Sequence, residues 1–152
     1  MESLLQNMAV GQEEMEDRYL IFWLDGQLFG LPIESVVQIV QMQEIIRIPQ
    51  TPAYEKGVIH LRGSIITVTD ARLRLGKAEA DYTERTCILV CSVAGKALGL
   101  IVDAVEEVIQ IGRENISSAP SRAAYANDYI LGVAKTDTGM VLLLSPEKLW
   151  SL

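Results

Sequence analysis

The same pattern of strands and turns occurs twice in this chain. The segment FWLDGQLFGLPIESVVQIV (22–40) aligns with CSVAGKALGLIVDAVEEVI (91–109) at a constant offset, and both glycines of the first coincide with glycines of the second. Each segment predicts a strand, a glycine turn, a second strand, an acidic residue that opens a tight turn, and a third apolar strand. A chance match between short apolar segments is the alternative, but the aligned glycines and acidic residues favour a duplication.

A second matching pair of segments extends the pattern. Pro49 precedes GVIHLRGSIITV (57–68) and Pro120 precedes YILGVAKTDTGMVLLL (129–144). Each of the two consists of an apolar strand, a polar break that contains glycine, and another apolar strand. Two matching halves of about five short strands each predict an all-β fold, in which two packed five-stranded β-barrels are related by an internal pseudo-repeat.

Helix signals are few and short. The IESVVQIV segment (33–40) is rich in β-branched residues, which favours one helical turn that feeds a strand. Asp70 is a suitable N-cap for a short helix that Gly76 would end, and the sequence Ser-Pro-Glu at 145–147 predicts a short C-terminal helix. Residues 1–17 are interpreted as a flexible leader with an acidic end, so the folded domain is expected over 18–152, as two interleaved β-barrel subdomains.

Charge and hydropathy exclude several classes of function. The chain carries 13 Lys and Arg against 20 Asp and Glu, a net charge of −7, which argues against a nucleic-acid binder and against docking on anionic lipid. The hydrophobic fraction of 49% is ample for a packed interior. No apolar run is long enough to span a bilayer, and the first residues have no secretory signature. We therefore expect a cytoplasmic protein that does not insert into the membrane.

Candidate catalytic and metal-binding groups are scarce. The chain has one histidine, His60, and two cysteines, Cys87 and Cys91, which lie four apart on a predicted strand and are too distant for a disulfide. A structural zinc site is improbable with so few ligands, and no phosphate-binding glycine motif is present. Glu106 and Glu107 are adjacent on a predicted strand, so they point to opposite faces. We expect neither an enzyme nor a cofactor or metal site.

Two basic features remain open to more than one interpretation. The segment ARLRLGK, with Arg72, Arg74 and Lys77, is either a set of solvated charges on a short helix or a contact for a partner. His60 and Arg62 mark a turn between the strands expected at 57–60 and 64–69. They form either an exposed corner of the scaffold or a recognition corner, because arginine is enriched at interface anchors.

Four segments, in order, carry a family resemblance: YLIFWLDGQLFGLPIESVVQIV, IRIPQTPAYEKGVIHLRGSIITVTDARLRLG, ALGLIVDAVEEV and YILGVAKTDTGMVLLLSPEKL. Together they resemble the CheW family of chemotaxis adaptors from about Tyr19 to Leu149. The most specific part is the pattern P-x-x-x-x-G-V-I-x-L-R-G-x-I-I-x-V-x-D-x-R. The resemblance implies two five-stranded β-barrels and a non-enzymatic scaffold, consistent with the duplication.

The resemblance also implies partners. Such adaptors couple the cytoplasmic tip of chemoreceptors to the histidine kinase CheA, whose own CheW-like regulatory domain is expected to pair with the adaptor. The helical receptor tip is expected in an apolar groove between the barrels. The chain would then be cytoplasmic and recruited to receptor arrays at the membrane. Positions carried over as partner contacts are Val36, Gln38, Ile39, Gly57, His60, Arg62, Val105 and Val108.

Three departures from the family pattern affect this expectation. His60 replaces the usual asparagine before the LRG motif, Gln38 replaces a glutamate, and Ala71 replaces a leucine. The loss of the Gln38 charge puts an electrostatic contact with the kinase in doubt. Such changes would suit an adaptor of a second signalling system that does not exchange partners with the first.

Two other interpretations remain at this stage. Within the same fold, the chain could be a regulatory domain of a larger kinase or of a CheV-type protein. Met1, the short leader and the end at Leu152 favour a free-standing adaptor. In a different class, the chain could be a nucleic-acid-binding β-barrel, but its acidic charge opposes this.

Overall fold

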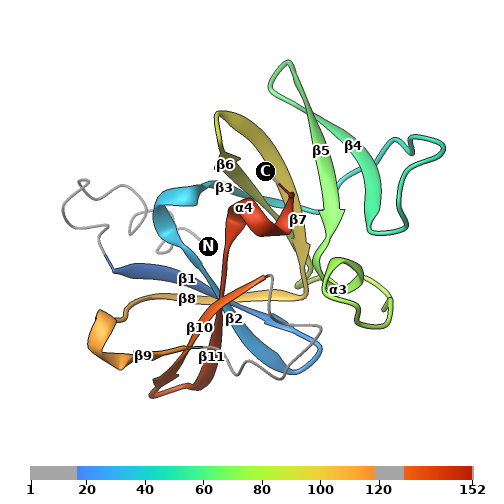
Figure 1. The fold of residues 1–152 in the computed structure, drawn as a ribbon. Coiled ribbons are helices and arrows are strands. Elements are labelled where there is room, and N and C mark those ends of the chain that lie inside the picture. Colours follow the sequence, from blue (N-terminus) through green and yellow to red (C-terminus); the bar gives the residue numbers. More distant parts are fainter. Residues whose placement is uncertain (1–16, 119–128, 152) are drawn as a thin grey trace.

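The computed structural model describes residues 17–118 and 129–151, and within them the chain forms two β-sheets with only short helical segments. Figure 1 shows one sheet above the other. The upper sheet has the strand order β3-β6-β7-β5-β4, and the lower sheet has the order β8-β1-β2-β11-β10-β9. The all-β class with short helices is confirmed. The leader predicted over 1–17 lies, apart from Asp17, outside the described residues.

The strands and the closing helix follow in the same order in both halves, but the second half has an additional short strand, β9, and its 3-10 turn comes after the third strand and not before it. The first half consists of β1 (Arg18–Leu24), β2 (Gln27–Pro32), the 3-10 turn η1 (Ile33–Ser35), β3 (Val36–Gln41), β4 (Glu55–Leu61), β5 (Ser64–Asp70) and α3 (Ala71–Arg74). The second half consists of β6 (Cys87–Val93), β7 (Lys96–Val102), β8 (Ala104–Gln110), η2 (Arg113–Asn115), β9 (Ile116–Ser117), β10 (Ile130–Thr136), β11 (Gly139–Leu144) and α4 (Pro146–Leu149).

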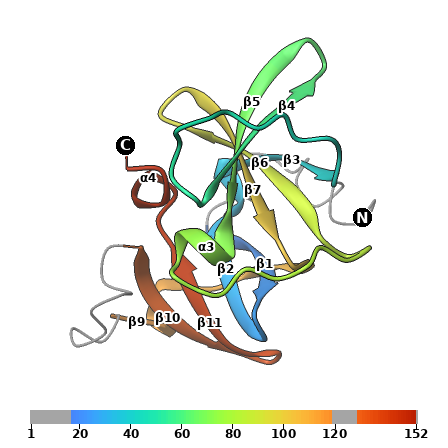
Figure 2. The same ribbon diagram turned by 90° about the vertical axis from the view of Figure 1, so that its right-hand side faces the viewer.

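The two halves exchange strands between the sheets. The lower sheet contains the first hairpin of the first half, β1–β2, and the later strands of the second half. The upper sheet contains the reverse combination, β6–β7 with β3, β4 and β5. Parallel pairings of β2 with β11 and of β5 with β7 join the halves. Neither sheet can therefore form from one half alone, and Figures 1 and 2 show the two sheets in contact along a shared seam.

The strand count differs from the prediction in one sheet. The upper sheet has five strands, as expected, whereas the lower sheet has a sixth, the two-residue β9. In the upper sheet the equivalent pairing shrinks to a single bridge between Ile46 and Val58. Short pairings of this kind leave no alternating apolar pattern in the sequence. Closure of either sheet into a barrel remains a prediction.

Turn chemistry explains the first set of aligned glycines. Asp25 and Gly26, at the β1–β2 turn, have φ of 51° and 76°, and Ala94 and Gly95, at the β6–β7 turn, have φ of 50° and 78°. Two central residues with positive φ define the type I′ turn, whose twist matches that of a two-residue hairpin. The hairpin predicted from Asp-Gly is confirmed, and the second copy repeats it.

Close packing explains the second set. A Cβ on Gly30 would lie 3.0 Å from Leu143 Cδ2, and a Cβ on Gly99 would lie 3.1 Å from Ile88 Cγ2. Neither glycine has a positive φ, so space is the constraint at both. Gly30 lies in β2 and Gly99 lies in β7, and each of these strands has an antiparallel neighbour on one side and a parallel neighbour on the other. A larger side chain at either glycine would push the packed strands apart.

Bulges are also duplicated. Each shift in strand register leaves one residue unopposed: Glu106 in β8, Val37 in β3, Lys56 in β4 and Leu131 in β10. The first two occupy equivalent places in the two halves, as do the last two. Val37, Glu106 and Leu131 are exposed at these bulges, whereas Lys56 is half-buried and forms an ion pair with Glu79.

The hydrophobic core has three parts. The largest cluster takes residues from both sheets, among them Phe22, Leu31, Leu89 and Leu100, and forms the seam between the sheets. A smaller cluster lies within each sheet, one around Ile21 and one around Ile59. The seam cluster therefore fixes the position of one sheet on the other.

The short helices also have equivalent starts. Asp70 accepts a hydrogen bond from Leu73 N at 3.2 Å, and Ser145 accepts one from Lys148 N at 3.3 Å. Both predicted N-caps are confirmed, and Gly76 follows α3 with φ of 78°. The 3-10 turn before β3 is also confirmed. The polar sequence RENISSAPSRAAYANDY (113–129) indicates a long surface connection, of which residues 119–128 lie outside the described part of the chain.

Candidate functional site

Five of the predicted partner residues lie along the seam between the sheets. Val36 and Ile39 of β3 are each 6% exposed and belong to the seam cluster, while Val105 and Val108 of β8 are half-buried and pack against it. Val36 and Val105 occupy equivalent places in the two halves, as do Ile39 and Val108. Gln38 lies between the two buried residues of β3 and is half-buried. The seam therefore offers half-buried valines of β8 as its accessible apolar surface.

Val37 is the residue at this edge that sequence reasoning missed. It is the bulge residue of β3 and is 61% exposed. Its equivalent in β8, Glu106, accepts a hydrogen bond from Trp23 Nε1 at 2.6 Å. When the two halves are aligned, Val37 falls opposite Glu106. An apolar residue where the other half has a charged one is the signal that could have identified Val37.

The other three predicted residues belong to the β4–β5 hairpin. Arg62 and Gly63 form its turn with φ of 51° and 83°, a third type I′ turn, and Arg62 is exposed. His60 is exposed and is paired across the hairpin with Ile65, which is 64% exposed. Gly57 is buried, and a Cβ there would lie 2.1 Å from Ile46 O. Gly57 therefore has a steric role that the resemblance did not indicate.

The structure does not bring the eight predicted residues into one site. β3 and β4 are the two edge strands of the upper sheet, and β8 is an edge strand of the lower sheet. The residues of β3 and β8 contact the seam cluster, whereas His60 and Arg62 lie at the far end of the β4–β5 hairpin, which projects from the body in Figure 1. The predicted residues therefore fall into two separate groups on the surface.

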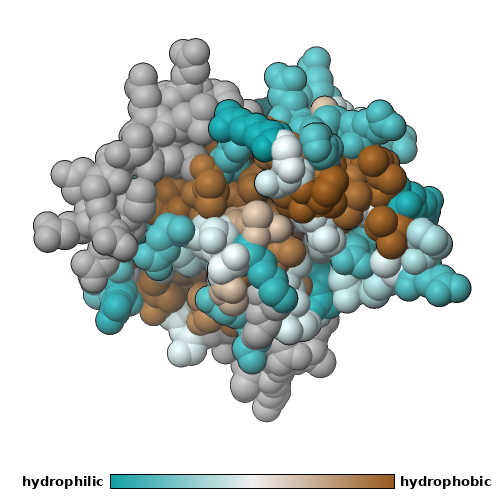
Figure 3. Space-filling model, turned by 90° about the horizontal axis from the view of Figure 1, so that it is seen from above, coloured by the Kyte–Doolittle hydropathy of each residue, from teal (hydrophilic) through white to brown (hydrophobic). Residues whose placement is uncertain are grey.

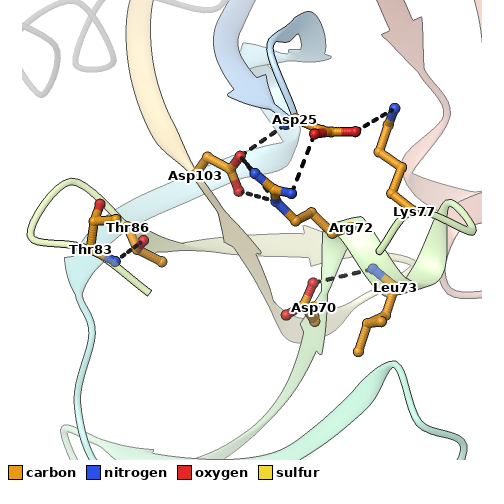
Figure 4. Close-up of polar contacts among 8 residues, drawn as sticks. All are labelled: Asp25, Asp70, Arg72, Leu73, Lys77, Thr83, Thr86 and Asp103. Carbon is orange, nitrogen blue, oxygen red and sulfur yellow. Dashed lines mark hydrogen bonds and ion pairs between the residues drawn. The ribbon is translucent and has the colours of Figure 1, made fainter. Parts of the chain in front are cut away.

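The basic segment after β5 has a structural role that neither interpretation anticipated. Arg72 donates to both carboxylate oxygens of Asp103, with Nε–Oδ1 at 2.9 Å and Nη2–Oδ2 at 2.5 Å, and lies 3.5 Å from Asp25 (Figure 4). Lys77 Nζ lies 3.9 Å from the same Asp25, whose backbone N–H donates to Asp103. The charges are paired within the chain and tie α3 to the β1–β2 and β7–β8 turns.

Burial and pairing oppose each other at Asp103. Partial burial by itself raises the pKa of the Asp103 carboxyl. The hydrogen bonds from Arg72 and from the Asp25 backbone N–H outweigh it, so the pKa of Asp103 is lowered. The carboxylate form is thus the one that the folded chain stabilises.

Arg74 joins the two helical segments. Its guanidinium lies 4.6 Å from the ring centroid of Tyr54 and 4.8 Å from that of Tyr129, two equivalent residues of the two halves. It also donates to Leu149 O at 2.6 Å and to Tyr129 Oη at 2.8 Å. Arg74 therefore fixes α4 against the junction of the sheets, where Figure 1 shows it.

The described residues offer little for covalent chemistry. Burial raises the pKa of Cys87 to about 11 and of Cys91 to about 12, so both thiols are unreactive at neutral pH. Among residues 17–118 and 129–151, no three His, Cys, Asp or Glu side chains are grouped to hold a metal ion. The same residues contain no helix with the length and hydropathy to cross a membrane.

The surface also bears an apolar feature. Seen from above, a band of hydrophobic residues crosses the face of the molecule, with hydrophilic residues on either side (Figure 3). Val40, Met42, Ile45 and Leu61 are only partly buried where they pack on the core cluster of the upper sheet, and Ile46 is 54% exposed. Apolar surface rimmed by polar side chains is typical of protein-binding faces.

Comparison with known proteins places this fold in a family. Residues 18–152 match the CheW-like domain. The chain is 33% identical over 150 residues to a chemotaxis protein CheW of Klebsiella aerogenes, which covers 98% of this chain and 87% of that protein. It is 35% identical over 145 residues to a probable chemotaxis protein CheW of Rhizobium etli, which covers 94% of both chains.

A solved structure agrees with the sequence relatives. The scaffolding protein TtCheW from Thermoanaerobacter tengcongensis is 34% identical and superposes with a TM-score of 0.84 over 90% of this chain and 93% of that one. Family, sequence relatives and fold thus coincide over nearly the whole chain, and so the chain belongs to the family of CheW-like domains, the scaffolding adaptors of chemotaxis signalling.

Proposed function

We propose that this protein is a cytoplasmic, non-enzymatic adaptor that couples the cytoplasmic tip of chemoreceptors to the histidine kinase CheA. The observation that carries the proposal is the match to the CheW-like domain over residues 18–152, which covers both sheets and the seam between them. Recruitment to receptor arrays follows from such coupling, since the adaptor itself would join the receptor to the kinase.

The seam is proposed to bind the receptor tip. A helical hairpin needs an apolar surface with polar borders. Val105 and Val108 supply half-buried apolar side chains over the buried Val36 and Ile39, and the exposed Val37 extends this surface along β3. Gln38 adds an uncharged polar group at the border.

The β4–β5 hairpin is proposed to be a second contact, with Arg62 as its anchor. The guanidinium of Arg62 is exposed, and within the described part of the chain no carboxylate pairs with it. An arginine held at a rigid turn presents its donors in a fixed direction. An acidic group of a partner is the expected acceptor.

Co-sedimentation tests the proposal. The adaptor is sedimented with a membrane-free receptor signalling fragment, with and without CheA, and the bound fraction of each protein is measured. We expect the kinase to sediment with the receptor only when the adaptor is present. The proposal is contradicted if the adaptor binds neither protein, or if the same fraction of the kinase sediments with the receptor whether or not the adaptor is present.

A variant of Arg62 sharpens this experiment. Arg62→Ala is expected to weaken assembly about tenfold or more while leaving Tm within about 2 °C of the wild type, because an exposed turn side chain contributes little to folding. Arg85→Ala removes another exposed arginine and serves as the matched control. A large loss of Tm on Arg62→Ala would instead assign the residue a structural role.

A further inference from the structure

The second half carries apolar side chains at positions where the first half carries polar ones. The hairpins β4–β5 and β10–β11 align residue by residue, because each begins with a bulge followed by a buried glycine, Gly57 or Gly132. In this alignment Ile130, Leu131 and Leu142 replace Glu55, Lys56 and Thr67. Ile130 and Leu142 pack against the edge of the seam cluster, whereas Leu131 is 59% exposed. Packing in the core therefore does not explain why a leucine stands at 131 where the first hairpin has a lysine.

These apolar residues form a continuous strip along the second hairpin. We call the strip the β10–β11 strip; it consists of Ile130, Leu131, Val133, Met140 and Leu142. Val133 is paired across the hairpin with Leu142, so their side chains share one face. Leu131 is 59% exposed and Met140 is 50% exposed. Leu131 lies at the open end of the hairpin and Met140 lies next to its turn, so one large apolar side chain is exposed at each end of the half-buried row.

A hollow adjoins this strip. It has a volume of about 710 Å³ and is bounded by the β1–β2 turn, by the chain that follows α3, and by the strip itself. Phe29 and Leu75 contribute apolar walls, and Ile130 and Leu142 belong to both the strip and the hollow. The volume is in the range of pockets that hold a large side chain or a small ligand.

The duplication indicates what the hollow lacks. Leu75 is the C-cap of α3, and Trp150 is the C-cap of α4, so the two are equivalent. The indole of Trp150 reaches β5 and donates to Thr69 Oγ1 at 3.2 Å. At the equivalent place in the other half, the shorter Leu75 borders the hollow. One half supplies its own aromatic ring here, and the other leaves space.

Two lysines lie beside the apolar surface. Lys77 borders the hollow, with its ammonium 5.8 Å from the ring centroid of Phe29 and 3.9 Å from the carboxylate of Asp25. Lys135 is exposed and is paired across the hairpin with Met140. One lysine thus borders the hollow and the other lies at the turn end of the strip, and these local cations favour acidic side chains in the bound segment.

We propose that the β10–β11 strip and its hollow bind an amphipathic segment of a partner protein. The segment places one aromatic side chain of tryptophan size in the hollow, rests its other apolar side chains on the strip, and brings acidic side chains to Lys77 and Lys135. Aromatic residues held in pockets are the usual anchors of such interfaces. The surface is formed by other strands than β3 and β8, so the proposal does not depend on the proposed function.

A peptide probe tests this proposal on the full chain. The probe is a synthetic amphipathic helix with one tryptophan, leucines at i+3, i+4 and i+7, and glutamates on the opposite face; binding is followed by amide shifts in NMR spectra. We expect saturable shifts in Phe29, Leu75 and the β10–β11 strip. A tryptophan-to-alanine probe is expected to bind at least tenfold more weakly, and a glutamate-to-glutamine probe several-fold more weakly.

Substitutions borrowed from the first half provide the matched variants. Leu131→Lys, alone and with Leu142→Thr, is expected to reduce probe affinity tenfold or more while the amide spectrum stays folded. Ile65→Lys, on the other hairpin, is the control that should bind like the wild type. Absence of saturable binding, shifts confined to β3 and β8, or unchanged affinity of Leu131→Lys would overturn the proposal. Concentration-dependent dimers that Leu131→Lys abolishes would overturn it too, because the occupant would then be a second copy.

Discussion

Replacement of Gly57 by alanine should destabilise the fold, because it breaks one specific backbone contact between β4 and the segment that contains Ile46. The added Cβ would lie 2.1 Å from Ile46 O, 2.8 Å from Ile46 C and 3.0 Å from Arg47 Cα, all backbone atoms. The φ of Gly57 is 140°, a conformation that side chains rarely adopt. The clash cannot be relieved by rotation of a side chain, so the segment that contains Ile46 must move away from β4.

The cost can be worked from the contacts that this movement breaks. Ile46 N donates to Val58 O at 2.8 Å, and Val58 N donates to Ile46 O at 2.9 Å, and these bonds form the bridge. Loss of two backbone hydrogen bonds costs about 1 kcal/mol each. Strain at the positive φ adds about 1–3 kcal/mol. We expect Gly57→Ala to lower the free energy of unfolding by about 3–5 kcal/mol, or Tm by about 10 °C.

Urea denaturation followed by circular dichroism measures this loss, and Gly63→Ala is the matched control in the same hairpin. Gly63 also has a positive φ, 83°, but nothing lies within 4 Å of its Cβ position. The control should lose only the strain of about 1 kcal/mol. If Gly57→Ala lost no more than Gly63→Ala, the steric reasoning would be wrong, and a direct role of Gly57 in partner contact would become the better explanation.

Two further predictions concern titratable groups. Because the pKa of Asp103 is lowered in the folded state, its contribution to stability is present above the ordinary carboxyl pKa and is lost as pH falls through the lowered value. Asp103→Asn should therefore cost about 1 kcal/mol at pH 7 and progressively less as the pH falls below the ordinary carboxyl pKa, measured by urea denaturation over this pH range. Cys87 and Cys91 have pKa values of about 11 and about 12, so a thiol reagent at pH 8 should label the native chain slowly and both thiols rapidly in urea; rapid native labelling would contradict their burial.

Local signals in the sequence determined the parts of the fold that were predicted correctly. The Asp-Gly turn, the Asp70 and Ser145 caps and the 3-10 turn before β3 each depend on a few neighbouring residues. The sequence did not indicate which strands the two interleaved halves exchange, because this depends on which hairpin lies beside β5 and β11. Pairing partners that are distant in the chain leave no periodicity in either strand.

The candidate site was predictable only as a set of positions. The resemblance supplied eight residues, but it could not separate the seam from the hairpin, since that separation follows from the sheet order. It also missed Val37, whose exposure results from a bulge, and the pairing of Arg72 with Asp103 across turns of different sheets. A charged residue in the sequence indicates neither which residue it pairs with nor how deeply its side chain is buried.

The duplication offers a way to divide the eight residues between folding and recognition. Gly57 and Gly132 are equivalent, and a Cβ at either would clash, at 2.1 Å from Ile46 O or 2.7 Å from Ile116 Cγ2, so both halves need glycine for packing. Arg62 has no such counterpart, because Asp137 occupies the equivalent turn position and does not adopt a positive φ. A residue that the fold needs should be matched in both halves, whereas a residue that serves a partner is free to differ. By this criterion we expect Gly57 to serve the fold and Arg62 to serve recognition. Gly57→Ala should then lower the free energy of unfolding, whereas Arg62→Ala should weaken partner binding and leave stability nearly unchanged.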